Sequence, residues 1–394
     1  MLAWAVRGSL LAPAAVLLGF GGAADGAWFE RHVVLPALYP PPPSWTLPVL
    51  RMAAVAMGLA LAACAVVAGP RATPGAVARV ALAGALAVCT SELALRVLDL
   101  AVPATIEELL GSPDPKTGWV YPPRRSLDLA IHGGRVIRYA FDAHGDRAPS
   151  AEWVEDTQAP TVLVAGESVA TGHGLPWSET FAARLAGILH AQVVDVATGG
   201  YGSGQVHLRT IEALARFAHP VAVVTTVLPV QVGRNLHDDR PHLVLRDGAL
   251  ILAPASSSHL RLRQLLVNKL PYLSEADLQK SLQLGRAILH ATAAATRARG
   301  AQPLFVFASF GPPRPLDAHP EAFIVRALLD DLPHIVVDMD PAHTQPWDGH
   351  PDAEGARQIA VAIAEALARG HEVQAVSAAG PEARRGNPGA TATP

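Results

Sequence analysis

The chain has 394 residues, of which 50% are hydrophobic and 16% are charged, and its mean hydropathy is +0.26. It is longer than one typical domain, and the apolar excess predicts that part of it is embedded in a membrane. The net charge of -3 and the scattered basic residues exclude a stripe suited to a phosphate backbone, so we expect no nucleic-acid partner. Both cysteines, Cys64 and Cys89, lie in apolar segments, which excludes a disulfide framework and a cysteine metal cluster elsewhere.

Three apolar runs stand in the first hundred residues, at 9–24, 52–69 and 80–100. Their lengths are borderline to sufficient for crossing a bilayer. The first run also fits a cleaved signal peptide, because Arg7 precedes it and small residues end it. The third contains Glu92 and Arg96, which lie four residues apart on one helix face and can pair. We therefore predict a membrane region over 1–104 with two or three transmembrane helices.

The orientation follows from the loop between the second and third runs. This loop, 70–79, carries Arg71 and Arg79 and no acidic residue, so the positive-inside rule places it in the cytoplasm. The chain after the third helix then lies on the exoplasmic side, periplasmic or extracellular. The inference reverses if the third run does not cross.

The rest of the chain is predicted as a stalk or lead-in over 105–160, a catalytic-type domain over 161–370 and a disordered tail over 371–394. The stalk contains a predicted strand at 135–141, and the tail is rich in Ala, Gly, Pro and Arg. In the domain, β-rich runs alternate with amphipathic ones, and a hairpin is expected around Asp247-Gly248. Strands are predicted at 161–165, 192–196, 221–227, 303–307 and 334–338, and helices at 179–190, 205–218, 274–299, 320–331 and 351–369. This alternation predicts an α/β fold, a parallel sheet with helices on both faces.

A serine follows the first predicted strand of that domain directly, in Gly166-Glu-Ser168. Ligands of open parallel sheets bind beyond the carboxyl ends of the strands, where this serine stands. A serine hydroxyl is a weak nucleophile and needs an imidazole to accept its proton and an acid to orient that imidazole. The alternative interpretation of Ser168 is a helix N-cap.

Two further segments fit the same chemistry. The second strand runs into Gly199-Gly-Tyr-Gly-Ser-Gly204, where glycines allow backbone N–H groups to approach a ligand and form an oxyanion hole. Asp348 and His350 are two residues apart, so that one loop can present both side chains to one pocket. The alternatives are a flexible glycine loop and an acidic turn that caps the following helix.

Other histidines are predicted to serve no catalytic purpose. We interpret His173, His237 and His343 as surface or loop residues. A metal site from Asp348, His350 and His343 lacks a convincing ligand spacing, so we predict neither a metal nor a cofactor.

These segments together resemble the SGNH, or GDSL-like, hydrolase superfamily, in particular its bacterial membrane-anchored members. The residues that carry the resemblance are, in chain order, Thr117-Gly-Trp119, Phe141-Asp-Ala-His-Gly-Asp-Arg147, Ala165-Gly-Glu-Ser-Val-Ala-Thr-Gly172, Asp195-Val-Ala-Thr-Gly-Gly-Tyr-Gly202 and Asp348-Gly-His-Pro-Asp-Ala-Glu-Gly355. The resemblance implies a flavodoxin-like sheet, Ser168 as nucleophile, His350 as general base and Asp348 as its orienting acid. It also implies that the N–H groups of Ser168 and Gly200 bind the oxyanion.

The third sequence block departs from the family pattern. The family has Gly-x-Asn-Asp after the third strand and uses the asparagine as a further oxyanion donor, whereas this chain has Val227-Leu-Pro-Val-Gln-Val-Gly-Arg-Asn235. Gln231 could replace that amide, or Asn235 could reach back. Loss of one such donor costs about 100-fold to 1000-fold in rate, so the departure bears on efficiency.

The α/β-hydrolase elbow, Gly-x-Ser-x-Gly, is a rival interpretation of the serine segment. In that fold the acid follows a separate, earlier strand, and Asp338 or Asp340 would supply it. The Asp-x-His spacing and the Gly200 loop favour the SGNH interpretation.

The expected function is that of a membrane-tethered, exoplasmic serine esterase. Its expected partners are the lipid bilayer and a small acyl ester such as acetyl, carried on a cell-envelope or exported glycan; the glycan is inferred from the resemblance and the location alone. The sequence leaves three alternatives open: an O-acyltransferase with the same triad, a lipase, and a tethered binding or assembly protein with weak catalysis.

Overall fold

The computed structural model describes residues 2–25, 28, 46–67, 73–97, 111–131, 135–256, 260–261, 275–310 and 321–378. The chain forms two compact units, one from 1–105 together with 255–280, and one from 106–254 together with 281–394.

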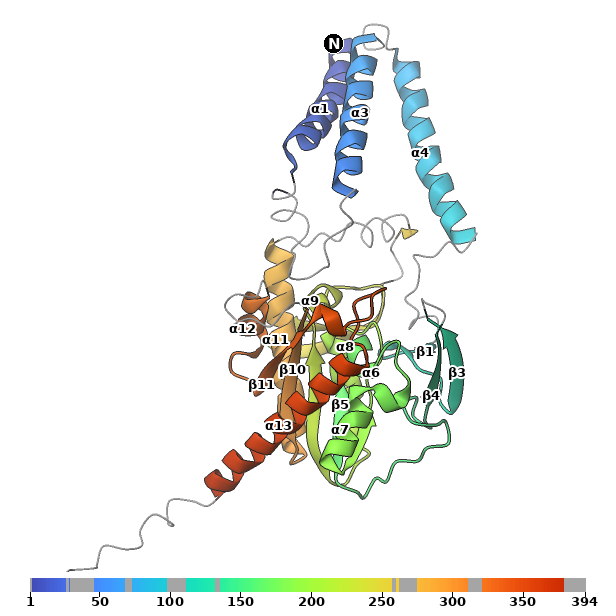
Figure 1. Ribbon diagram of the computed structural model, residues 1–394. Helices are drawn as coiled ribbons and strands as arrows, with labels where there is room; N and C mark the ends of the chain where they lie inside the picture. The colour runs from blue at the N-terminus through green and yellow to red at the C-terminus, as the bar shows by residue number, and fades with distance from the viewer. Residues whose placement is uncertain are drawn as a thin grey trace, which may run out of the picture. The chain divides into compact units, whose positions relative to one another are not determined.

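The described part of the first unit includes three long helices, α1 (Leu2–Ala23), α3 (Thr46–Val67) and α4 (Pro74–Val97). Helices α1 and α3 pack side by side through small residues (Figure 1). A Cβ at Gly21 would lie 2.4 Å from Cγ2 of Val55, and one at Gly58 would lie 2.8 Å from Cγ of Leu18. Glycine thus permits the close backbone approach that is common between helices in membranes.

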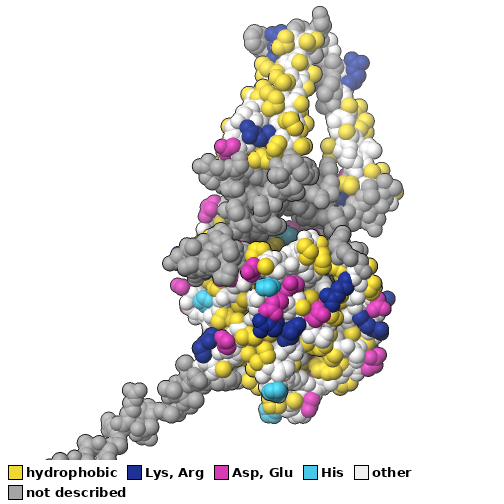
Figure 2. All heavy atoms as spheres, in the orientation of Figure 1, with side chains coloured by type: hydrophobic (Ala, Val, Ile, Leu, Met, Phe, Trp, Pro, Cys, Tyr) yellow, Lys and Arg dark blue, Asp and Glu magenta, His cyan; other side chains and the backbone are white. Residues whose placement is uncertain are grey.

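The three helices occupy the positions of the three predicted apolar runs. Among the described residues, one helix, 47–67, is long and apolar enough to cross a membrane, and the apolar helix 7–23 is shorter. In Figure 2 the visible faces of α1, α3 and α4 carry mostly hydrophobic side chains. Leu82, Leu86 and Val97 of α4 are exposed, and its Glu92 pairs with Arg96 at 2.6 Å as the spacing predicts.

The second unit is built on a parallel sheet of five strands. The strands are β5 (Thr161–Ala165), β6 (Gln192–Asp195), β7 (Pro220–Val227), β10 (Gln302–Phe310) and β11 (His334–Met339). Their spatial order is β11-β10-β7-β5-β6. Numbered along the chain this is 2-1-3-4-5, the flavodoxin-like order, so the α/β prediction is confirmed.

Both faces of the sheet are covered, which explains why its strands read as continuous apolar runs. Val162 and Val164 of β5 share a core with α7 (Phe181–Leu189) and α13 (Ala353–Ala378). Leu163 and Ala165 face the other way and pack with α8 (Ser203–Leu214). The remaining helices are α6 (Ser168–Thr171), α9 (Pro229–Arg234), α11 (Glu275–Ala298) and α12 (Ala322–Leu329).

Two features at the periphery bear on the predictions. The hairpin of β8 (His242–Arg246) and β9 (Ala249–Ala253) turns at Asp247 and Gly248, whose φ angles are 50° and 78°, as a type I′ turn requires. Helix α13 continues to Ala378, so the boundary predicted at residue 370 falls inside a helix. The remainder of the predicted disordered tail, 379–394, lies outside the described residues.

The lead-in segment belongs to the same compact unit as the sheet. It forms two antiparallel pairs, β1 (Ser112–Asp114) with β2 (Gly118–Val120) and β3 (Arg125–Ala130) with β4 (Val136–Phe141). Beyond β4, the Arg147 N–H donates to the Asp195 carbonyl at 3.0 Å, which ties the lead-in to the end of β6.

Candidate active site

Ser168 stands on a turn that leaves β5 and begins α6, as predicted. A Cβ on Gly166 would lie 1.9 Å from Oγ1 of Thr226 on the neighbouring strand β7, so only glycine fits between the strands there. Ser168 is the first residue of α6, so its backbone N–H has no acceptor within the helix. The nucleophile candidate and a backbone donor are therefore presented together at the carboxyl edge of the sheet.

The structure brings His350 and Asp348 to this serine. His350 Nε2 lies 2.8 Å from Ser168 Oγ, and His350 Nδ1 lies 3.0 Å from Asp348 Oδ2. The second contact has ion-pair distance but an N–H direction that misses hydrogen-bond alignment. Gly349 between them has φ of 76°, and the His350 N–H donates to Asp348 Oδ1 at 3.1 Å, so the loop turns both side chains the same way.

The electrostatics keep Asp348 ionised. Partial burial acts to raise its pKa, but the nearby imidazoles of His173 and His350, the charge of His350 and the hydrogen bond from the His350 backbone N–H outweigh burial and hold the pKa well below the ordinary value. An ionised carboxylate at this position can orient the imidazole and stabilise its protonated form.

Glu167 provides a second acceptor for the Ser168 proton, and the sequence pattern did not predict this contact. Its Oε2 lies 2.5 Å from Ser168 Oγ, and its Oε1 accepts the Val169 N–H at 2.9 Å and caps α6. Arg234 Nη1 lies 3.4 Å from the same Oε2. The single hydroxyl proton of Ser168 thus has two acceptors, the carboxylate and the imidazole.

The glycine loop after β6 is held in a defined shape around Gly200. Gly200 has φ of 78°, which favours glycine. On one side the Gly199 N–H donates to the Tyr121 hydroxyl at 3.1 Å, and on the other the Gly202 N–H donates to Gln205 Oε1 at 3.0 Å. The backbone around Gly200 is therefore fixed by side chains of the lead-in and of α8.

The two predicted amide donors behave differently. Asn235 is engaged at α8, where its Oδ1 accepts the Ser203 N–H at 2.8 Å and its Nδ2 donates to Ser203 Oγ at 3.3 Å. Gln231 is buried, and its Oε1 accepts the Leu228 N–H at 3.1 Å. Its Nε2 has no hydrogen-bond partner among the residues that the structure describes.

Three other residues at the site escaped prediction. His173, predicted as a surface or loop residue, does lie in a turn, but its Nε2 is 3.3 Å from Asp348 Oδ2, a contact that the sequence did not indicate. The Tyr139 hydroxyl accepts the Gly174 N–H at 2.7 Å, and Arg147, stacked on the Tyr139 ring, donates to the Leu175 carbonyl at 2.8 Å. The motif 141–147 was the only signal for Arg147, and nothing local in the sequence indicated Tyr139.

Asp340, a rival candidate for the orienting acid, and the possible metal ligands have the following contacts. Asp340 accepts the Ala342 N–H at 2.9 Å and caps the short helix η4 (Pro341–His343), and the acid beside His350 is Asp348. The ligand atoms that approach within 4.8 Å of one another belong to two groups in the described chain: His173, Asp348 and His350, and Asp142, Asp146 and Glu155. His343 is in neither group.

The side chains of both groups make contacts within the protein. The first supplies the contacts to Ser168 and Asp348 described above. In the second, Arg209 and Arg216 each lie 2.5 Å from a carboxylate oxygen of Asp146, and Arg216 Nε lies 3.3 Å from Glu155 Oε1.

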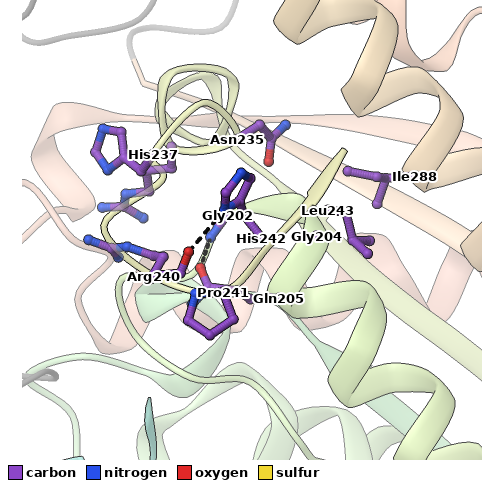
Figure 3. Close-up of a pocket in the computed structure, with 11 residues that line it drawn as sticks. Gly202, Gly204, Gln205, Asn235, His237, Arg240, Pro241, His242, Leu243 and Ile288 are labelled. Atoms are coloured by element: carbon purple, nitrogen blue, oxygen red, sulfur yellow. Dashed lines mark hydrogen bonds between the residues drawn. The ribbon is translucent and has the colours of Figure 1, made fainter. Parts of the chain in front are cut away.

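A small pocket adjoins α9 (Figure 3), and its lining includes Gly202, Arg234, Asn235, His237, Arg240 and His242. Burial, reinforced by the charge of Arg240, lowers the pKa of His237 to about 4, so this ring is neutral at pH 7. Arg234 and Gly202 link the pocket to the neighbourhood of Ser168, because Arg234 contacts both Glu167 and the Tyr201 carbonyl.

No family model matches the chain, and no curated protein matches it. Among solved structures, the acetyl xylan esterase Est2A from the rumen bacterium Butyrivibrio proteoclasticus is 12% identical with a TM-score of 0.35, covering 56% of this chain and 66% of its own. TesA is 22% identical with a TM-score of 0.32, covering 52% and 97%. AlinE4, an SGNH-hydrolase family esterase, is 18% identical with a TM-score of 0.28, covering 55% and 98%. The chemistry considered below rests on the contacts within this chain.

Proposed function

We propose that the protein is an SGNH-type serine hydrolase that cleaves carboxylic esters. The observation that carries the proposal is the 2.8 Å separation of Ser168 Oγ from His350 Nε2, with Asp348 on the other ring nitrogen. A serine hydroxyl within hydrogen-bond reach of an imidazole that an acid orients is the arrangement that activates a serine nucleophile.

In the proposed reaction Ser168 Oγ attacks the ester carbonyl and its proton passes to His350 Nε2. Asp348 stabilises the imidazolium that forms. The backbone N–H groups of Ser168 and Gly200 and the Gln231 Nε2 donate to the oxyanion. His350 then returns the proton to the departing alcohol, and a water molecule, activated by the same imidazole, releases the acid and frees the serine.

The proposed substrate is a small acyl ester, such as acetyl, on a cell-envelope or exported glycan. This part rests on the resemblance of the three sequence blocks and on the proposed location, in which apolar helices hold the enzyme on the exoplasmic side. The support for the location is the apolar helix 47–67 and the two basic residues that follow it, Arg71 before α4 and Arg79 in its first turns, and the location requires α4 to cross the membrane as well. The same triad serves an O-acyltransferase if a sugar hydroxyl replaces water at the acyl-enzyme.

The decisive test compares Ser168→Ala with the wild-type full chain in detergent. We expect the wild type to react with a fluorophosphonate probe and to hydrolyse p-nitrophenyl acetate, and Ser168→Ala to lose the label and at least about 1000-fold in kcat. Ser178→Ala, in the short helix η2 (Trp177–Glu179), serves as the matched control and retains both. Equal labelling and turnover in Ser168→Ala and wild type would refute the esterase proposal.

The second candidate, a tethered binding or assembly protein, is favoured by one observation. The side chain of Asn235 caps α8, so the family's asparagine donor has no direct counterpart there. A wild-type protein that is folded but neither labels nor turns over would support this candidate. Addition of a glycan acceptor to the ester assay separates transfer from hydrolysis, and a series of longer acyl chains tests lipase activity.

A further inference from the structure

Asp348 has two imidazole neighbours, and a simple triad needs only one. His350 Nδ1 lies 3.0 Å and His173 Nε2 lies 3.3 Å from the same oxygen, Asp348 Oδ2. The two rings also face each other, with centroids 4.6 Å apart and planes tilted by 38°. The His173 side chain is 14% exposed, so water screens this contact little.

The backbone fixes the place of His173. Its N–H donates to the carbonyl of Ser168 at 3.0 Å, and its own carbonyl accepts from Gln345 Nε2 at 2.6 Å. It stands between Gly172 and Gly174, whose φ angles of 72° and 74° make the chain turn sharply on both sides. The ring is therefore delivered to Asp348 by a segment that is bonded to the nucleophile turn and to the acid–base loop.

We propose that His173 is a positioning residue that donates from Nε2 to Asp348 and thereby fixes the carboxylate against the catalytic imidazole. This inference rests on the proposed esterase function. The Nδ1–Oδ2 contact of His350 is poorly aligned as an isolated hydrogen bond, so a second donor that restrains the rotation of the carboxylate has a geometric effect on His350. The low pKa of Asp348, where hydrogen bonding from His173 and His350 outweighs burial, agrees with a doubly engaged carboxylate.

The ionisable groups around His173 and His350 determine how removal of the His173 imidazole changes the pH profile of activity. Asp348 contacts a nitrogen of each ring, while Glu167 and Arg234 are near His350 on the side of Ser168. When His173 no longer shares Asp348, more of the negative charge acts on His350 and favours its protonated form. The acidic limb of the activity profile then moves to higher pH.

The test uses His173→Phe, His173→Gln and the control His343→Phe in the full chain, with p-nitrophenyl acetate. We expect His173→Phe, which keeps the ring shape and loses the donor, to reduce kcat by about ten- to hundredfold, as for a lost hydrogen bond to a charged group, with KM little changed. His173→Gln restores an N–H donor and recovers most of kcat. His343→Phe behaves as wild type. The acidic limb moves to higher pH in His173→Phe alone.

Wild-type kcat and pH profile in His173→Phe would overturn the proposal. Equal losses in the Phe and Gln variants with an unmoved acidic limb would also overturn it, because they would indicate packing alone. ¹⁵N NMR of the ring-labelled histidines gives a readout independent of turnover: the titration midpoint of His350 must rise in His173→Phe. If the wild type lacks esterase activity, the function proposal fails, and the NMR titration still decides whether His173 restrains Asp348.

Discussion

Glu167 immediately precedes the nucleophile candidate, and the residue is 1% exposed. The family pattern has aspartate at this position. The longer side chain here bends back so that one oxygen caps α6 and the other meets Ser168 Oγ. Arg234 lies close to that second oxygen. The electrostatic potential at Ser168 therefore depends on the Glu167–Arg234 ion pair as well as on His350 and Asp348.

Opposite charge changes at this ion pair should move the pH profile in opposite directions. We expect Glu167→Gln, which keeps an oxygen for the α6 cap, to move the acidic limb of kcat/KM to lower pH by up to about one unit, because protonated His350 loses a nearby negative charge. Arg234→Gln should move the limb to higher pH. The measurement is p-nitrophenyl acetate hydrolysis from pH 5 to 9. Shifts of the same sign in both variants would contradict the electrostatic explanation.

The proposed nucleophile, base and acid were identifiable from sequence because block 165–172 falls at the end of β5 and block 348–355 runs into the start of α13, after the last strand of the sheet. His173 and Glu167 were not, although His173 lies only five residues from Ser168. Its role depends on a contact with Asp348, 175 positions later, and a local pattern carries no information about such a contact.

At the scale of elements, the altered third block forms α9 and the residue after it. The two amide side chains have different contacts. Asn235, just after α9, caps α8. Gln231 caps α9 through its Oε1, while its buried Nε2 has no hydrogen-bond partner among the described residues. The sequence predicted both as possible oxyanion donors, and only the tertiary position of α8 separates them.

Substitution of the two amides should therefore produce different defects. We expect Gln231→Leu to reduce kcat by about 100-fold to 1000-fold, because a donor to the oxyanion is lost. Asn235→Ala should mainly lower stability, by about 1 kcal/mol, because a helix cap is lost. Steady-state kinetics and thermal unfolding of the same two variants check this division. A larger kcat loss in Asn235→Ala than in Gln231→Leu would reverse the assignment.

The five strands of the sheet and the helices α7, α8, α11, α12 and α13 followed from hydrophobic periodicity, whereas α6 and α9 were not predicted. Strand β5 has the predicted bounds because its flanking Pro160 and Gly166 stop the apolar run. The lead-in was harder to predict. The hydroxyl of Tyr121 accepts a hydrogen bond from the Gly199 N–H, and that of Tyr139 accepts one from the Gly174 N–H. These hydrogen bonds join residues that are 78 and 35 positions apart in the sequence.

At the scale of the whole molecule, the direction of the chain across the membrane is testable. We expect alkaline phosphatase fused after Pro394 to be active, since Arg71 and Arg79 favour the cytoplasmic side for the loop before α4 and α4 is proposed to cross the membrane after it. The matched fusion within that loop, after residue 72, should be inactive. The opposite pattern would place the proposed active site in the cytoplasm and exclude an exported glycan as the substrate.

The second unit also contains a buried acid whose charge should make its stability depend on pH. Burial raises the pKa of Glu155 from its ordinary value of 4.5 to about 7, although the charge of Arg216 opposes this rise. The folded state therefore binds the proton more tightly than the unfolded state, and stability falls as pH rises from 4.5 to about 7.

We expect Glu155→Gln to abolish this fall, which amounts to no more than about 3 kcal/mol. Thermal unfolding midpoints of the full chain at pH 5 and pH 8 measure it. Glu152→Gln, which removes the same charge from an exposed position, should leave the pH dependence as in wild type. An unchanged pH dependence in Glu155→Gln would assign it to another group.

The side-chain amide of Gln345 donates to the carbonyls of both His173 and Pro351. One residue thereby sets the distance between the turn that carries the serine and the loop that carries its base. An engineer who transplants either segment alone into a related scaffold would break that spacing, even if every catalytic residue were retained. The smallest portable unit that keeps Ser168, His350 and Asp348 in register is therefore the pair of segments 166–175 and 345–351 together.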